Sequence, residues 1–133
     1  MDAQLTRLFD LPEYQLRKFP QPDMLCMKQE GQWRLYSTAE VCELTDALAA
    51  GLLRMGIGHE QQDVEACDKV AIISFNRPEW IICDQACQRT GSVVVPIYPT
   101  LNARELNYIL KEAAVNAVAA GDAALLELTR SAS

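Results

Sequence analysis

Three short apolar runs alternate with three helical patterns in the second half of the chain, and this alternation constrains the fold more than any other feature. The run KVAIIS at residues 69–74 is nearly continuous and rich in β-branched side chains, as expected for a strand covered on both faces. SVVVPI and VNAVAAG follow it, and a helical pattern comes after each of the three runs. Strands that alternate with helices through short links predict right-handed crossovers and a parallel sheet with helices on both faces.

Polar residues that can cap a first helical turn mark the expected helix starts. In the pattern S/N-x-x-E the first side chain accepts from a free amide while the glutamate reaches back to the start of the turn. The sequence predicts three such boxes, Ser37 with Glu40, Asn76 with Glu79 and Asn102 with Glu105, and a simple cap at Asp122. Capping accounts for the three glutamates without acid or base catalysis.

The first half of the chain predicts a different set of elements. Leu5, Leu8 and Phe9 have helical spacing, and Pro12 predicts a break after them. The chain has the size of one domain, and we expect residues 1–133 to form one. Its expected parts are a lead-in helix and loop at 1–22, a hairpin at 23–36 with its turn at QEGQ, a helix at 37–56 that ends at Gly56, a polar surface loop, and the α/β crossovers at 69–133.

Charge, hydropathy and cysteine content exclude several classes of protein. The net charge of -6 argues against nucleic acid as a partner, because nonspecific affinity for phosphate backbones comes from lysine and arginine. No leader-like segment or long apolar run is present, so the expected location is the cytoplasm.

The five cysteines are odd in number and lack C-x-x-C pairs, so we expect reduced, mostly buried thiols rather than disulfides or a zinc site. Cys83 and Cys87 are four residues apart and share one helix face, which favours small core residues over a redox or metal pair.

The best candidates for ligand contact follow the first two strands of the predicted sheet. Ligands of open α/β sheets gather at the carboxyl edge, where Ser74, Asn76, Tyr98 and Thr100 are expected to lie. Each has a structural alternative: Asn76 as a helix cap, Tyr98 as a packing residue, and Ser74 and Thr100 as turn residues. The residues alone favour the second interpretation, in which PIYP is a rigid turn packed by its tyrosine.

The familiar catalytic and nucleotide-binding motifs are missing from the sequence. No G-x-G-x-x-G follows a strand, and there is no G-x-x-x-x-G-K-S/T, H-E-x-x-H or G-x-S-x-G. The one histidine, His59, falls in the polar loop and is expected to be solvated. We therefore expect no catalytic residue, no cofactor-binding residue and no metal ligand in this chain.

Several stretches resemble the N-terminal region of adenylate-forming enzymes, the acyl-CoA synthetases that activate fatty acids. The pairing of N-R-P-E-W with P-I-Y-P-T is similar to the long-chain branch of that family. The stretches that carry the resemblance over residues 23–122 are WRLYSTAEV, ALAAGLLRMGI, DKVAIISFNRPEW and RTGSVVVPIYPTLNARELNYIL. One departure is the segment between Gly56 and Asp68, which is longer than usual and ends Cys67-Asp68 where the family has Gly-Asp.

The resemblance implies the N-terminal subdomain of the acyl-CoA synthetase-like fold and a parent ligase that uses ATP, Mg²⁺ and CoA. Such an enzyme converts a fatty acid and ATP to an acyl adenylate and pyrophosphate, and then transfers the acyl group to CoA. The family's phosphate-gripping loop and catalytic lysine have no matching positions here, so the segment alone is expected to be inactive, with the rest of the parent chain as its partner.

Three alternatives remain at the level of sequence. In the first, the chain is the noncatalytic N-terminal segment of a long-chain fatty acid ligase, and any peripheral contact with a membrane is made through that parent enzyme. In the second, the chain is a free-standing interaction or regulatory module. A small nucleotide-binding protein is the weakest of the three, because no glycine loop supports it. A partial sheet leaves an unpaired edge, which predicts self-association of the isolated chain.

Overall fold

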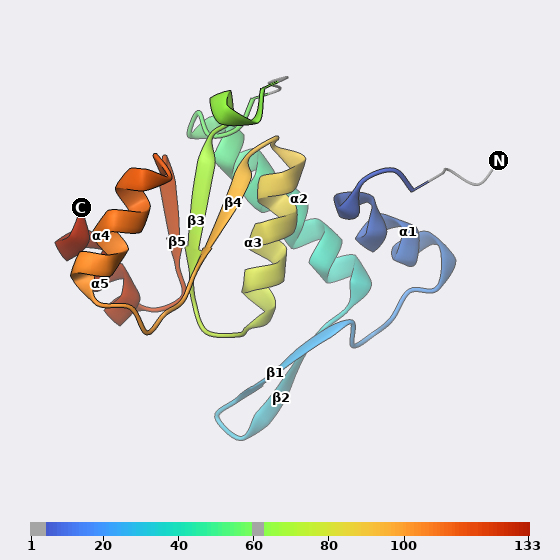
Figure 1. Cartoon of the computed structure of the whole chain (residues 1–133). Coiled ribbons are helices and arrows are strands. Elements are labelled where there is room, and N and C mark those ends of the chain that lie inside the picture. Colours follow the sequence, from blue (N-terminus) through green and yellow to red (C-terminus); the bar gives the residue numbers. More distant parts are fainter. Residues whose placement is uncertain (1–4, 60–62) are drawn as a thin grey trace.

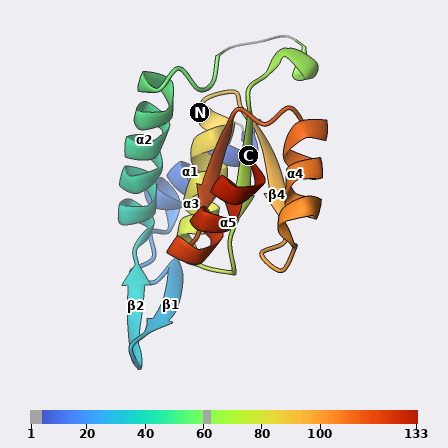
Figure 2. The same cartoon turned by 90° about the vertical axis from the view of Figure 1, so that its left-hand side faces the viewer.

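The computed structural model describes residues 5–59 and 63–133. A parallel sheet of three strands lies between two helical layers, and a hairpin extends from this body (Figure 1). The view turned by 90° shows helix α2 on one side of the sheet and helix α4 on the other (Figure 2). The predicted fold class, a partial parallel sheet with helices on both faces after a helix and a hairpin, is confirmed.

The sheet has the strand order β4-β3-β5, with β3 in the centre. Strand β3 spans Lys69–Ile73, β4 spans Val93–Ile97 and β5 spans Ala117–Ala120. Both neighbours pair with β3 in parallel. Pro96 lies within β4, opposite Ile72, although a proline cannot donate a backbone hydrogen bond to the sheet. Strand β4 is an edge strand here, and an edge tolerates a residue without an amide hydrogen.

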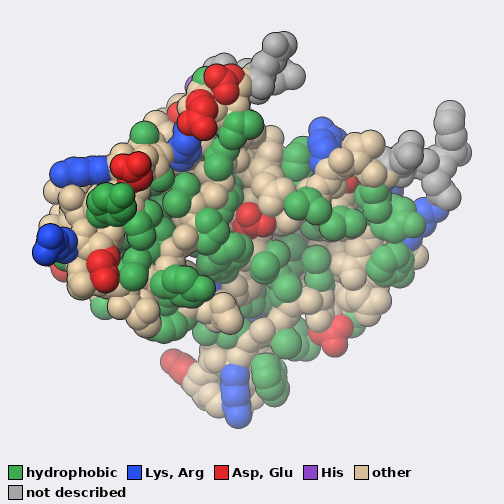
Figure 3. All heavy atoms as spheres, in the orientation of Figure 1, with side chains coloured by type: hydrophobic (Ala, Val, Ile, Leu, Met, Phe, Trp, Pro, Cys, Tyr) green, Lys and Arg blue, Asp and Glu red, His purple; other side chains and the backbone are tan. Residues whose placement is uncertain are grey.

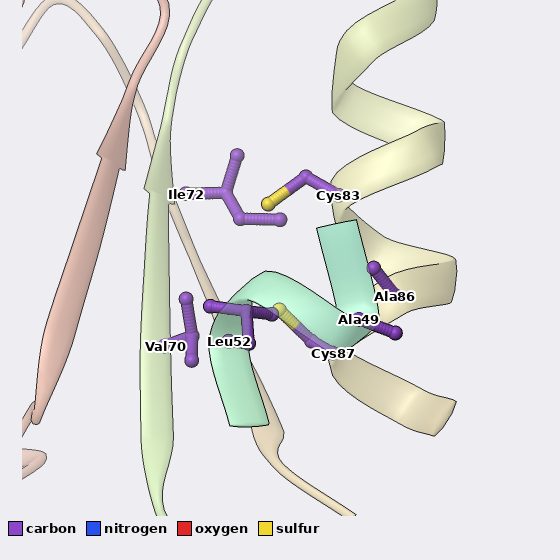
Figure 4. Packing of buried hydrophobic residues seen from close by; sticks show 7 residues of the cluster. All are labelled: Ala49, Leu52, Val70, Ile72, Cys83, Ala86 and Cys87. Atoms are coloured by element: carbon purple, nitrogen blue, oxygen red, sulfur yellow. The ribbon is translucent and has the colours of Figure 1, made fainter. Parts of the chain in front are cut away.

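Two helices cover each face of the sheet. Helices α2 (Thr38–Arg54) and α3 (Pro78–Arg89) pack on one face. Figure 4 shows this layer, in which Val70 and Ile72 of β3 point toward Leu52 of α2 and toward Cys83 and Cys87 of α3. The other face carries helices α4 (Ala103–Glu112) and α5 (Ala123–Ala132), which bury Leu106 and Leu125 against β3 and β4.

The predicted hairpin is present and has a tight turn. Strand β1 spans Leu25–Gln29 and pairs in antiparallel fashion with β2, Gln32–Tyr36. The two loop residues, Glu30 and Gly31, have φ angles of 48° and 81°. A two-residue turn with both φ angles positive matches the right-handed twist of the flanking strands, which explains the turn expected at QEGQ.

The N-terminal helix differs from the prediction. A short 3₁₀ helix, η1, spans Leu8–Asp10, and helix α1 spans Leu11–Lys18. Pro12 therefore lies in the first turn of the main helix instead of breaking one, because its missing amide hydrogen has no intrahelical role there. Arg89 of α3 holds α1 in place through Glu13, with 2.7 Å between Nη2 and Oε1.

Three of the four predicted caps form. The Asn102 and Glu105 side chains bond each other's backbone amides at 3.0 Å, which is the full predicted box. Asp122 accepts from the amide of Leu125 at 2.8 Å. Ser37 accepts from the amide of Glu40 at 3.1 Å, but the Glu40 carboxylate pairs with Arg34 instead of reaching back.

The predicted Asn76 cap is wrong. Helix α3 begins at Pro78, and its N-cap residue is Arg77, which makes no side-chain capping bond. The Glu79 carboxylate accepts from the Arg77 guanidinium instead of an amide near Asn76. The Glu79 carboxylate thus bonds the side chain of Arg77, the residue after the expected cap, and does not complete a capping box.

The long loop follows the α2 helix stop as predicted. Gly56 has a φ of 78°, the left-handed conformation that ends a helix. Within the loop a second 3₁₀ helix, η2, spans Val64–Ala66. The amide of Gly58 donates to Oδ2 of Asp68 at 2.8 Å, and this bond ties the start of the loop to the residue just before β3. His59 is exposed, as expected. Residues 60–62 of this loop lie outside the described residues.

Hydrophobic side chains remain at the surface over much of the face shown in Figure 3. Large exposed examples in the described chain are Trp33 on the hairpin, Phe75 and Tyr98 beyond the strand ends, and Tyr108 on α4. Self-association through an open sheet edge stays a prediction. Across residues 5–59 and 63–133, the helices fall short of the length and apolar character that a membrane crossing needs.

Candidate functional site

The four candidate residues lie around one surface depression at the carboxyl edge of the sheet. Strands β3 and β4 end side by side at Ile73 and Ile97. A depression of about 650 Å³ opens beyond these ends, and its lining includes all four predicted residues, Ser74, Asn76, Tyr98 and Thr100. Parallel strands bring their carboxyl ends to one edge, so segments more than twenty residues apart form one wall.

The side chains around the depression are accessible. Tyr98 is 79% exposed, so the expectation that it packs under the turn is wrong. Thr100 lies in a turn, as its structural alternative predicted, and is exposed with Asn76. The Ser74 hydroxyl donates to the Phe75 carbonyl at 2.8 Å and keeps its lone pairs as acceptors.

Two aromatic residues of the site were missed by the sequence analysis. Phe75 and Trp80 line the same depression, and the Phe75 side chain is 59% exposed. A usable signal was present, because Phe75 stands between two polar candidates just beyond a strand and Trp80 falls in the first turn of the next helix. With Tyr98 they give the depression an aromatic wall and a polar rim, a combination typical of small-molecule sites.

A polar cluster lies beside the depression. Arg77 donates from Nε to Glu79 Oε2 at 2.8 Å and from Nη2 to Oε1 at 3.1 Å. Tyr36, at the end of β2, donates its hydroxyl to Glu79 Oε1 at 3.2 Å. The hydrogen bond from Arg77 is the main reason that the pKa of Glu79 falls from 4.5 to about 2. Burial, followed by the nearby Glu79 charge, raises the pKa of Tyr36.

Three of the five cysteines, Cys42, Cys83 and Cys87, are buried as expected, whereas Cys26 is exposed and Cys67 is half-buried. Cys83 and Cys87 are buried on α3, and Figure 4 shows both pointing toward Val70, Ile72 and Leu52. The hydrogen bond with Cys83 and burial raise the pKa of Cys87, so this thiol stays protonated and unreactive. Within residues 5–59 and 63–133 no group of His, Cys, Asp and Glu side chains gathers that could hold a metal ion.

The sequence profile of the AMP-binding enzyme family matches residues 13–132. The chain belongs to this AMP-binding family. Among curated relatives, long-chain-fatty-acid–CoA ligase 6 of Homo sapiens is 37% identical over 93 residues, which cover 68% of this chain and 12% of that protein. Long-chain-fatty-acid–CoA ligase FadD15 of Mycobacterium bovis is 36% identical over 83 residues, which are 62% of this chain and 13% of that one.

Solved structures of other proteins have the same fold. The anthranilate CoA ligase AuaEII, in complex with anthranoyl-AMP, superposes with a TM-score of 0.75 at 17% identity, over 98% of this chain and 23% of its own. A fatty acyl CoA synthetase of Mycobacterium tuberculosis gives a TM-score of 0.62 at 25% identity, over 73% of this chain and 18% of its own. The predicted family resemblance is confirmed. The chain spans about an eighth of the length of the curated AMP-binding relatives it matches.

Proposed function

We propose that residues 1–133 form one N-terminal unit in the adenylating domain of an ATP-dependent long-chain fatty acid–CoA ligase. The parent enzyme joins a fatty acid to ATP as an acyl adenylate, releases pyrophosphate, and passes the acyl group to the thiol of CoA. The observation that carries the proposal is the match of residues 13–132 to AMP-binding enzymes together with identity to long-chain ligases. ATP, Mg²⁺ and CoA are the proposed cosubstrates and metal of the parent.

The proposed role of this unit is structural support and one wall of a substrate site. We assign no catalytic residue to it. Ser74, Asn76, Tyr98 and Thr100 are the proposed ligand contacts, because they share an open depression with Phe75 and Trp80. The aromatic wall suits a planar or apolar part of a ligand, and the hydroxyl and amide groups suit its polar part.

Ligation assays on the complete enzyme test these contacts. Tyr98→Ala and Thr100→Ala are expected to raise the KM for one of the three substrates while the protein stays folded. Tyr108→Ala is a matched control, because Tyr108 is 67% exposed on α4 and lies outside the lining of the depression. Ligation by a protein with all four candidates replaced, at unchanged KM for fatty acid, ATP and CoA, would remove these residues from the site.

The proposed inactivity of the isolated chain has a separate test. Fatty acid-dependent exchange of pyrophosphate into ATP is measured on the 133-residue protein and on the parent. We expect exchange in the parent alone. Exchange by the 133-residue protein at a rate above a heat-denatured control would contradict the proposed inactivity of the isolated chain.

A further inference from the structure

Arg77 lies where three separate segments of the chain meet. Two of its guanidinium nitrogens bond the Glu79 carboxylate, and the third, Nη1, donates to the carbonyl of Gly121 at 2.5 Å. Gly121 belongs to the turn between β5 and α5 and is 44 residues away in sequence. A planar fork with several donors suits a carboxylate and a carbonyl at the same time.

The hairpin reaches the same point through Glu79. The Tyr36 hydroxyl donates to Glu79 Oε1 at 3.2 Å, and the Tyr36 side chain is 7% exposed at the end of β2. Arg77 and Glu79 are 30% and 43% exposed. The pair therefore joins the hairpin, the start of α3 and the β5–α5 turn at a site that is only partly open to water.

The β5–α5 turn also contacts the candidate ligand site, because Gly121 packs closely against Ser74. A Cβ atom placed on Gly121 would lie 2.2 Å from Oγ of Ser74, so only glycine allows this approach. The amide of Gly121 donates to the Ile73 carbonyl at 2.9 Å. Ser74 lines the carboxyl-edge depression, and it also lines a smaller one of about 310 Å³ with Arg77, Glu79 and Gly121.

We propose that Arg77 is a positioning residue for the carboxyl-edge depression. Its bond to the Gly121 carbonyl holds the β5–α5 turn against Ser74, and through Glu79 and Tyr36 it fixes the hairpin to the same point. Arg77 itself contacts no ligand in this account. The proposal goes beyond the ligase activity, since it concerns contacts within this chain and is tested without any catalytic assay.

Amide hydrogen exchange measured by NMR on the 133-residue chain tests the proposal. In Arg77→Ala the Gly121 amide should exchange about tenfold faster, as expected for loss of one partly exposed charge-assisted hydrogen bond. The amides of Val70 and Ile72 in the central strand provide the reference for global stability. The Ser74 amide should also shift its resonance, which a general loss of stability would not produce in the folded state.

Arg77→Lys keeps the positive charge but cannot bond the carboxylate and the carbonyl through separate nitrogens. It should show the same local loss at Gly121, and it serves as the decisive variant if Arg77→Ala does not fold. Arg130→Gln is the matched control, because Arg130 makes a 3.8 Å ion pair with Glu127 on α5 and is 69% exposed. Its Gly121 exchange should equal that of the wild type.

Two results would overturn the proposal. One is a folded Arg77→Lys protein in which Gly121 exchange and the Ser74 resonance match the wild type. The other is an increase in exchange that is equal at Gly121, Val70 and Ile72, because Arg77 would then act only on global stability.

Discussion

Replacement of Glu79 by glutamine should lower the free energy of unfolding at neutral pH and leave it nearly unchanged in acid. The displacement of the Glu79 pKa from 4.5 to about 2 corresponds to roughly 3 kcal/mol if it is taken at face value. The Glu79 side chain is 43% exposed, and water screens its charge. We therefore expect Glu79→Gln to lose about 1 kcal/mol at pH 7.

The pH dependence follows from the direction of the displacement. The Glu79 carboxyl of the unfolded chain takes up a proton near its ordinary pKa of 4.5, whereas the folded chain does so only near 2. Acid therefore favours the unfolded state in this window, and the stabilisation is complete above about pH 5.5 and disappears as the pH falls toward about 2. The difference between wild type and Glu79→Gln should shrink over the same window.

Urea denaturation followed by tryptophan fluorescence at several pH values between 7 and about 3 measures this difference. Glutamine can still accept the Tyr36 hydroxyl, so the variant removes the charge more than the packing. Glu127→Gln is the control, since Glu127 is 76% exposed and its ion pair should contribute almost nothing. A Glu79→Gln difference that is the same at pH 7 and in acid would refute the reasoning.

The remaining predictions also use paired variants in urea denaturation. Asn102→Ala should lower the free energy of unfolding by about 1 kcal/mol, because it removes a complete capping box. Asn76→Ala, at the cap that does not form, should change the free energy of unfolding by only about a few tenths of a kcal/mol. Equal losses in both proteins would show that the observed caps do not matter. Gly121→Ala should lose roughly 1–3 kcal/mol because its methyl group meets Ser74. Gly51→Ala, inside α2 with open space around it, should gain about 0.5–1 kcal/mol, and a gain at Gly121 would contradict the close approach.

The arrangement of strands and helices could be predicted because its signals are local. The apolar run before Ser74 predicts a buried strand, and the capping box of Asn102 and Glu105 forms between residues of a single helical turn. The same N-x-x-E pattern failed at Asn76, because its glutamate bonds the side chain of Arg77. That arginine is held in turn by a carbonyl 44 residues away, and no local pattern contains such a partner.

The candidate site was predictable in position but incomplete in composition. The rule that ligands gather at the carboxyl ends of parallel strands placed Ser74 and Tyr98 at one edge, and both line the depression. The exposure of Tyr98 depends on what covers the turn, which the sequence does not state. Trp80 lies in the first turn of α3, and this place brings it to the same edge, but the helical pattern of the sequence does not show which first-turn residue faces the depression.

The most direct test of the central proposal is fatty acid-dependent exchange of labelled pyrophosphate into ATP by the protein encoded by the complete reading frame that contains these 133 residues. The account predicts exchange that needs ATP, Mg²⁺ and a long-chain fatty acid, followed by thioester formation when CoA is added. A purified, folded product of that frame that shows no fatty acid-dependent exchange would contradict the ligase proposal and favour a noncatalytic module.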